Sequence, residues 1–251
     1  MFYTIHTMKK RLDIVLVQRG LVQTRERARA LIMENKVMVN DVPCTKPGTA
    51  VDADAATITL RDCDMPYVSR GGVKLDFALE HFGVDVGGMT ALDVGASTGG
   101  FTDCLLARGA VRVYAVDVGY GQLAWRLQND NRVITIDRTN IRYMDREVIP
   151  EGIDIAVVDV SFISLRIVIP AVLKFLGSGG RLICLIKPQF EVGRGAVGKG
   201  GIVRDEEKRL LVVRDLETFM LQTGLDLRGV CQSPIHGQKG NTEYLLYARI
   251  P

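Results

Sequence analysis

The chain has 251 residues, of which 47% are hydrophobic and 24% are charged. This mixture is typical of a globular protein with one large domain or two smaller ones, and it excludes a disordered chain. No apolar run approaches the roughly 18 residues that cross a bilayer, and residues 1–7 lack the pattern of a signal peptide. The cysteines lie far apart without a CxxC pair, so we expect no disulfide scaffold, no metal site and a cytoplasmic location.

Positive charge is concentrated near the N-terminus. Residues 9–36 hold eight basic and three acidic side chains, which gives 8 − 3 = +5, whereas the whole chain carries +3, so the remainder sums to 3 − 5 = −2. A basic cluster on a near-neutral chain favours a polyanionic partner such as nucleic acid. Charge alone leaves a solvated helix face as the alternative.

Two short helices and two strands are predicted before residue 61. Apolar side chains recur at helical spacing in the first two of these segments and alternate in the last two. The segments are residues 11–20, 24–34, 36–40 and 56–60. Arg25 and Arg29 are four residues apart and share one face of the second helix. The pattern predicts a small α+β module with a cationic helix face.

The order of several residues in this module is specific. They are Arg11-Leu12-Asp13, Leu16, Gly20, Thr24-Arg25, Ala28, Ile32 and Val37-Met38-Val39-Asn40. The module therefore resembles the S-four-type RNA-binding domain, which implies binding to structured RNA. The candidate RNA contacts are the basic side chains Lys10, Arg11, Arg25, Arg29 and Lys36. We expect this domain to span residues 8–62 with a linker at 63–66; a small basic domain with another role is the alternative.

Strands and helices alternate from Tyr67 onward. Apolar strands are predicted at 91–94, 111–116, 132–136, 153–158 and 181–186. Helices are predicted at 101–108, 121–129, 165–176 and 205–223. This alternation favours a mostly parallel sheet covered on both faces. Two further strands, 227–231 and 243–249, are joined by only eleven residues, so we expect a seven-stranded sheet whose last strand is antiparallel.

A glycine-rich turn follows the first of these strands. Gly95-Ala-Ser-Thr-Gly99 precedes a predicted helix, and glycine lets the backbone approach a ligand closely. Acidic residues end the first four strands, at the edge where open α/β sheets bind ligands. These residues are Asp93, Asp117, Asp137 and Asp159.

Three kinds of site compete for this turn. A dinucleotide site needs G-x-G-x-x-G, but Ser97 takes the place of the middle glycine. A hydrolase would use G-x-S-x-G with Asp159 and His236, yet no HGGG-type oxyanion segment is present. S-adenosylmethionine (SAM) has no pyrophosphate, and its sulfonium, amino and ribose groups favour acids at strand ends. We therefore expect SAM as the cofactor, bound by Asp93, Gly95, Ser97, Thr98, Gly99, Phe101, Asp117, Asp137 and Asp159.

The segment from Gly193 to Gly200 nearly spells a P-loop. Gly200 stands where the motif requires a magnesium-binding serine or threonine, and no helix is predicted to begin there. We interpret the segment as a flexible flap beside the site, with simple disorder as the alternative.

Five motifs extend over most of the chain. They are Val68-Ser-Arg-Gly-Gly-Val-Lys-Leu75, Gly95-Ala-Ser-Thr-Gly99, Asp159-Val-Ser-Phe162, Lys187-Pro-Gln-Phe-Glu191 and Gly240-Asn-Thr-Glu243. On these motifs the chain resembles the TlyA family, also called haemolysin A, in which an S-four-type domain precedes an FtsJ-type RNA 2′-O-methyltransferase. The resemblance implies a Rossmann-like SAM-dependent methyltransferase fold and action on cytidine 2′-hydroxyls of ribosomal RNA, in one or both ribosomal subunits. It also implies a catalytic tetrad of Lys74, Asp159, Lys187 and Glu243.

Topology predicts where three of the tetrad residues lie. Asp159 and Lys187 follow neighbouring strands, and Glu243 opens the antiparallel strand, so all three should meet at one edge of the sheet. The place of Lys74 rests on the family alone. A neutral Lys187 could accept the 2′-hydroxyl proton and a charged one could stabilise the alkoxide, and the sequence leaves both open. The sulfonium already activates the methyl group, so no metal is needed.

Two other functions fit parts of the sequence. A membrane-active haemolysin would need a secretion signal, a membrane-spanning run or a long amphipathic helix. The sequence shows neither of the first two, and the α/β pattern explains the amphipathic segment 205–223 as a helix that covers the sheet. An RNA-binding protein with an inert methyltransferase domain is the second, and the intact tetrad argues against it. The oligomeric state is not predicted.

Overall fold

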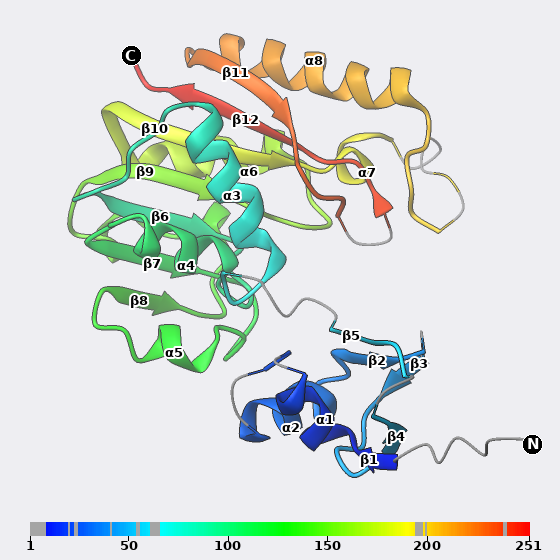
Figure 1. The fold of residues 1–251 in the computed structure, drawn as a ribbon. Coiled ribbons are helices and arrows are strands. Elements are labelled where there is room, and N and C mark those ends of the chain that lie inside the picture. The colour runs from blue at the N-terminus through cyan, green and yellow to red at the C-terminus, as the bar shows by residue number, and fades with distance from the viewer. Residues whose placement is uncertain are drawn as a thin grey trace, which may run out of the picture. The chain divides into compact units, whose positions relative to one another are not determined.

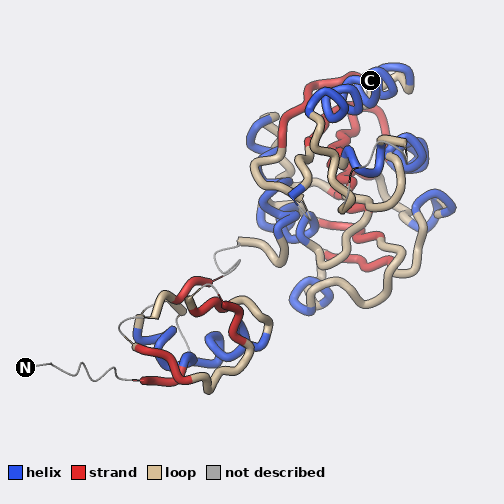
Figure 2. Tube along the Cα trace, turned by 90° about the vertical axis from the view of Figure 1, so that its right-hand side faces the viewer, coloured by secondary structure: helices blue, strands red, loops and turns tan. Residues whose placement is uncertain are grey.

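The computed structural model describes residues 9–19, 21–22, 25–40, 42–53, 56–60, 66–193, 198, 200–237 and 240–251. The chain forms two compact units, residues 1–65 and 66–251, which we call the N-terminal and C-terminal units (Figures 1 and 2). Residues 63–65 of the predicted linker, Gly20, Thr24 and most of the predicted flap lie outside the described residues. The predicted domain boundaries at 8 and 62 also fall there and stay predictions.

The N-terminal unit packs two helices against short antiparallel strands. The helices are α1 (Leu12–Gln18) and α2 (Arg25–Met33). The strands are β1 (Lys9–Arg11), β2 (Val37–Val39), β3 (Val42–Cys44), β4 (Ala50–Asp52) and β5 (Ile58–Leu60). One sheet has the order β3-β2-β5, and β1 pairs with β4. The apolar residues at helical spacing, such as Leu12, Leu16 and Ile32, are fully buried and form its core.

The C-terminal unit is built on a seven-stranded sheet. Its strands are β6 (Thr90–Val94), β7 (Arg112–Val116), β8 (Val133–Ile136), β9 (Ile153–Val158), β10 (Leu176–Ile186), β11 (Asp226–Gln232) and β12 (Tyr244–Arg249). Their order is β11-β12-β10-β9-β6-β7-β8. The strand β12 is antiparallel to both of its neighbours, whereas the other pairs are parallel. The predicted mostly parallel sheet with an antiparallel last strand is confirmed.

Helices cover both faces of this sheet. They are α3 (Arg70–His81), α4 (Gly100–Ala107), α5 (Trp125–Gln128), α6 (Leu165–Val172), α7 (Pro188–Glu191) and α8 (Glu206–Gln222), with 3-10 turns η1 (Ile141–Tyr143), η2 (Arg146–Val148) and η3 (Leu173–Phe175). Helices α3 and α4 lie on one face and α6 and α8 on the other (Figure 1), and their apolar side chains join two separate cores. Both faces are apolar because neighbouring strand residues such as Ala91 and Leu92 point to opposite cores.

Two predicted helices are shorter in the structure. The helix predicted at 121–129 forms only as α5, because Gly121 has a positive φ of 63° and Ala124 donates its N–H to the carbonyl of Thr98. These residues belong to a loop that packs on the glycine turn. The helix predicted at 165–176 ends as α6 at Val172, and η3 leads into β10.

Within the ranges described above, no helix is both long enough and apolar enough to cross a membrane. The same ranges hold no group of three or more histidine, cysteine, aspartate or glutamate side chains arranged to bind a metal ion.

Candidate active site and cofactor site

The glycine turn between β6 and α4 has a backbone that most residues avoid. Gly95 and Gly99 have φ values of 87° and 97°, and Ser97 has 48°. A Cβ atom on Gly95 would lie 2.6 Å from the carbonyl oxygen of Asp159, the residue that follows β9. Glycine at position 95 therefore lets the turn pack directly on the neighbouring strand end, where a tetrad residue is predicted.

Two of the predicted acids lie beside this turn at the carboxyl ends of the strands. Asp117 follows β7 and accepts hydrogen bonds from the N–H of Ser97 at 2.8 Å and of Gly119 at 2.7 Å. Asp137 follows β8 and accepts one from the N–H of Gly121 at 2.9 Å. These carboxylates connect the glycine turn to the loop before α5, so the predicted cofactor residues gather at one edge of the sheet.

Asp93 differs from the other acids because it is fully buried inside β6. Its Oδ2 accepts a hydrogen bond of 2.7 Å from the Thr102 hydroxyl, and its Oδ1 has no hydrogen-bond partner among the described residues. Burial raises the pKa of Asp93 to about 7, and the negative charges of Asp159 and Asp117 add to that effect. Direct contact between Asp93 and a cofactor stays a prediction.

The remaining predicted cofactor residues separate into exposed and buried ones. Thr98 is exposed at the turn and its carbonyl accepts the N–H of Ala124 at 3.0 Å. Phe101 is only 3% exposed, and its ring lies against Gly71 of α3. Its structural contact is thus with α3, and its predicted contact with the cofactor stays untested.

Asp159 and Lys187 form the first of two lysine–carboxylate pairs. Lys187 Nζ lies 2.5 Å from Asp159 Oδ1 and donates a hydrogen bond of 2.9 Å to the Ser161 hydroxyl. The pair forms because β9 and β10 are adjacent and parallel, so the residues that follow them meet. The predicted adjacency of these two residues is confirmed.

Lys74 and Glu243 form the second pair. Lys74 Nζ, on α3, lies 2.5 Å from Glu243 Oε2, and Glu243 is only 3% exposed. The register pairs Ile186, the last residue of β10, with Tyr244, the first of β12, so Lys187 and Glu243 adjoin the same end of this strand pair. All four tetrad residues therefore meet at the edge that holds the glycine turn, including Lys74, whose place topology did not predict.

Three further residues fix this arrangement, and sequence reasoning gave them no role. Glu191 accepts hydrogen bonds from the Ser164 hydroxyl at 2.6 Å and the Leu165 N–H at 2.8 Å, which fastens the Lys187 segment to the Asp159 segment. Asn241 is buried; its Oδ1 accepts the Val203 N–H and its Nδ2 donates to Gly201. Ser161, Glu191 and Asn241 all lie inside motifs that the sequence displays.

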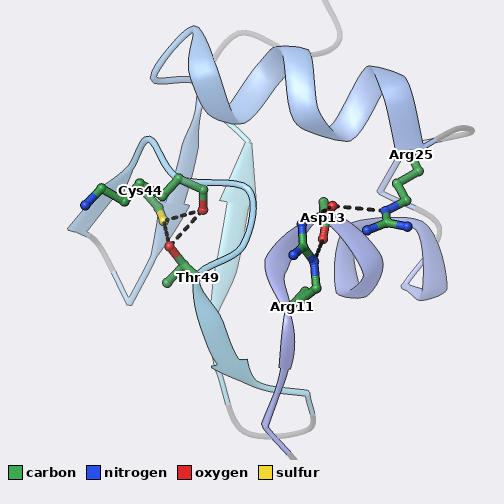
Figure 3. Close-up of polar contacts among 6 residues, drawn as sticks. Arg11, Asp13, Arg25, Cys44 and Thr49 are labelled. Atoms are coloured by element: carbon green, nitrogen blue, oxygen red, sulfur yellow. Dashed lines mark hydrogen bonds and ion pairs between the residues drawn. The ribbon is translucent and has the colours of Figure 1, made fainter.

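The candidate RNA-binding residues of the N-terminal unit fall into two groups. Arg11 and Arg25 both bind Asp13, as Figure 3 shows. Lys10, Arg29 and Lys36 lie apart from that contact: Lys10 donates to Gln18 at 3.2 Å, Lys36 pairs with Glu34 at 3.0 Å, and Arg29 is exposed.

The fold and site together define a class of enzyme. A seven-stranded sheet with only its last strand antiparallel, a glycine turn after the first strand and acids at the following strand ends are the features of a Rossmann-like SAM-dependent methyltransferase. A hydrolase is not supported, since no hydrogen bond joins the Ser97 hydroxyl to a histidine in the described part of the chain.

Comparison with known proteins gives the family. The FtsJ-like methyltransferase family matches residues 67–250, and the S4 domain family matches residues 10–56. The chain is 46% identical to the 16S/23S rRNA (cytidine-2'-O)-methyltransferase TlyA of Mycobacterium tuberculosis, over 96% of this chain and 90% of that one. It is 41% identical to Hemolysin A of Brachyspira hyodysenteriae, over 94% of this chain and 98% of that one.

A solved structure of a hemolysin candidate from Streptococcus thermophilus superposes with a TM-score of 0.75 at 41% identity, and covers 97% of this chain and 89% of that chain. The chain belongs to the TlyA/hemolysin A family of FtsJ-like, SAM-dependent RNA methyltransferases with an N-terminal S4 domain.

Proposed function

We propose that this enzyme transfers the methyl group of SAM to the 2′-hydroxyl of a cytidine ribose in ribosomal RNA. The observation that carries the proposal is the convergence of two lysine–carboxylate pairs at the sheet edge that also holds the glycine turn. The name of the Mycobacterium tuberculosis relative supports the same substrate. Because the proposed substrate is ribosomal RNA, we propose that the enzyme acts in the cytoplasm.

The residues at the glycine turn fit SAM. Asp117 and Asp137 offer carboxylate oxygens to ribose hydroxyls and to an amino group, and the buried Asp93 Oδ1 lacks a donor among the described residues. Ser97 and Thr98 are exposed at the same turn. When bound, SAM supplies a methyl group that the positive charge on sulfur has already activated.

Lys187 is the residue that we assign to the 2′-hydroxyl proton. Asp159 and Ser161 hold its Nζ in place, so a ribose bound at this edge meets an amine of fixed orientation. An oriented amine accepts that proton or stabilises the developing alkoxide, and such groups contribute roughly 10²- to 10⁴-fold to rate. Alignment of the attacking oxygen with the methyl group supplies the rest.

We assign Lys74 and Glu243 to binding of the RNA substrate and not to transfer of the 2′-hydroxyl proton. Glu243 is buried and holds Lys74, and a side chain at Gly237 would collide with the Glu243 carboxylate. The close backbone of Gly237 therefore restricts Glu243 to the orientation that faces Lys74. We assign Lys74 to positioning the target ribose or its phosphate.

The basic N-terminal unit supplies affinity for RNA. Its S4 domain and the exposed Arg29, together with half-exposed Arg11 and Arg25, provide cations that phosphates attract. We propose that ribosomal subunits are the partners and that this unit contacts folded ribosomal RNA through phosphates and 2′-hydroxyls.

The test is methyl transfer to separated ribosomal subunits. Purified protein is incubated with labelled SAM and small or large subunits, and 2′-O-methyl sites are mapped by reverse-transcription stops. We expect label on cytidine riboses with the natural chain and none with Lys187→Ala. Label on base atoms, or none on either subunit, would contradict the proposal.

A further inference from the structure

The most basic stretch of the chain encloses a fully buried carboxylate. Asp13, the second residue of α1, has a side chain that is 0% exposed. Its Oδ1 accepts a hydrogen bond of 3.0 Å from Arg11 Nε, and its Oδ2 accepts bonds of 3.0 Å from Arg11 Nη2 and from Arg25 Nε (Figure 3). We call these three residues the Asp13 cluster.

The cluster joins the beginnings of two helices. Arg11 immediately precedes α1, and Arg25 is the first residue of α2. The backbone of α1 is anchored to the loop between β3 and β4, since Asp13 N donates to the carbonyl of Pro47 at 3.2 Å. The Arg11 guanidinium also lies across Gly48, where a Cβ atom would be 3.4 Å from Nη1. Arg11 is therefore fixed by its surroundings as well as by Asp13.

The same two guanidinium groups remain accessible. The side chains of Arg11 and Arg25 are 49% and 52% exposed. Among the described residues, Nη1 of Arg11 and both Nη atoms of Arg25 make no hydrogen bond. The cluster carries 2 − 1 = +1, so it still attracts a phosphate after Asp13 is counted.

A buried carboxylate between two arginines reduces the conformational entropy that their side chains lose on binding RNA. An arginine side chain loses rotamer freedom when it binds, and a partner that already holds it lowers that loss. Arginine also presents its remaining N–H groups in a rigid plane that matches phosphate oxygens. The contact at Nε leaves both Nη groups of Arg25 without a bond to Asp13, and the contacts at Nε and Nη2 leave Nη1 of Arg11 without one.

We propose that Asp13 is a positioning residue for RNA, which holds Arg11 and Arg25 together as one binding site for backbone phosphate. The inference rests on the proposed RNA-binding function of the N-terminal unit. It reverses the expectation from charge alone, under which removal of an acidic residue strengthens binding to a polyanion.

The test uses the full chain with ribosomal subunits as substrate and measures KM and kcat for methylation. We expect Asp13→Asn to raise KM for the subunits by about tenfold while kcat and SAM affinity stay unchanged. Arg25→Lys keeps the charge and loses only the Nε contact, so it should raise KM severalfold while the Arg11 contacts remain. Because the Arg25 contact is one of those that Asp13→Asn removes, the double variant should be no worse than Asp13→Asn alone.

The matched comparison is Arg29→Lys, which makes the same substitution one turn later on α2 and should raise KM less than Arg25→Lys does, because it costs no contact with Asp13. Circular dichroism checks folding, and if Asp13→Asn disturbs it, Arg25→Lys against Arg29→Lys decides the question. Unchanged or tighter binding by Asp13→Asn, additive effects in the double variant, or equal effects of the two lysine substitutions would overturn the inference.

Failure of the proposed function gives a different pattern. If Arg11→Ala and Arg25→Ala also leave KM unchanged, the N-terminal unit does not contact the substrate RNA. Both its proposed RNA-binding role and the role of Asp13 are then wrong. If the alanine variants raise KM and Asp13→Asn does not, only the role of Asp13 is wrong.

Discussion

The two units arrange charge in opposite ways around their buried carboxylates. In the N-terminal unit one carboxylate, Asp13, lies between two arginines. At the C-terminal site two lysines, Lys74 and Lys187, pair with Glu243 and Asp159. Three further acids, Asp93, Asp117 and Asp137, lie at the glycine turn and the strands beside it. The excess charge at each site is opposite to that of its proposed ligand. The N-terminal cluster is cationic and would bind a phosphate, whereas the C-terminal site has more acids than lysines and would bind a sulfonium.

The choice of cation differs as well. Arginine is always charged and binds phosphate as a planar group, whereas lysine is a compact amine that can exchange a proton. The chain uses arginine around Asp13 and lysine at the tetrad. The difference indicates that the N-terminal unit holds its ligand while the C-terminal site acts on its ligand chemically.

The largest expected effect comes from removing the amine next to Asp159. Lys187→Ala should lower kcat by about 10³-fold, since it deletes the group assigned to the 2′-hydroxyl proton. SAM affinity, measured by calorimetry, should stay within a few-fold. Lys174→Ala, at an exposed lysine of η3, is the control. Full activity of Lys187→Ala would end the assignment of a chemical role to this lysine.

The second effect concerns the close packing of the turn on Asp159. Gly95→Ala places a Cβ atom 2.6 Å from a carbonyl oxygen at a φ of 87°, so the turn has to shift. Strain of about 3 kcal/mol corresponds to a loss of SAM affinity of roughly a hundredfold. Gly88→Ala, at a φ of 73° with open space around it, tests the backbone strain alone and should leave SAM affinity intact.

The third effect is a pH dependence of stability from Asp93. Its pKa is about 7 in the folded chain and 3.8 as a free side chain, so between these pH values the folded chain holds a proton that the unfolded chain has lost. The free energy of unfolding therefore falls as pH rises from about 4 to 7, by up to about 4 kcal/mol. Urea unfolding followed at Trp125, the one tryptophan of the chain, measures it. Asp93→Asn should remove the slope, and parallel profiles would show that Asp93 is not its source.

The smallest effect has the opposite sign. Hydrogen bonding to Arg11, with a further contribution from Arg25, holds the pKa of Asp13 at about 2, against its usual 3.8. This stabilisation is present above pH 4 and is lost as pH falls toward 2. Because both arginines are half exposed, we expect about 1–2 kcal/mol. Hydrogen exchange of α1 amides should show this loss in the natural chain and not in Asp13→Asn; an equal loss in both would contradict the pairing.

Sequence patterns predicted the parts of the site that depend on strand order. Asp159 and Lys187 follow adjacent parallel strands, and a short connection predicted the antiparallel strand that places Glu243. The position of Lys74 beside Glu243 could not be predicted, because tertiary contacts decide how α3 packs on the sheet. The complete burial of Asp93 could not be predicted either, since the alternation of residues along β6 does not show which carboxylates are shielded from solvent.

The Asp13 cluster shows the same limit at shorter range. Arg11-Leu12-Asp13 is visible as a motif, but the contact with Arg25 joins two helices, and charge counting treats Asp13 as a simple loss of positive charge. Helical spacing predicted α1 and α2 and their buried faces. Helical spacing does not predict which arginines form ion pairs with Asp13.

The place of β12 in the sheet has a consequence for protein synthesis. This strand contributes Glu243 at its start and lies between β10 and β11, although it is formed by residues 244–249. A nascent chain that has not yet released these residues from the exit tunnel leaves β11 without a neighbour and Lys74 without its carboxylate. An enzyme proposed to modify ribosomes thus completes its own site only after residues 244–249 have left the ribosome that makes it.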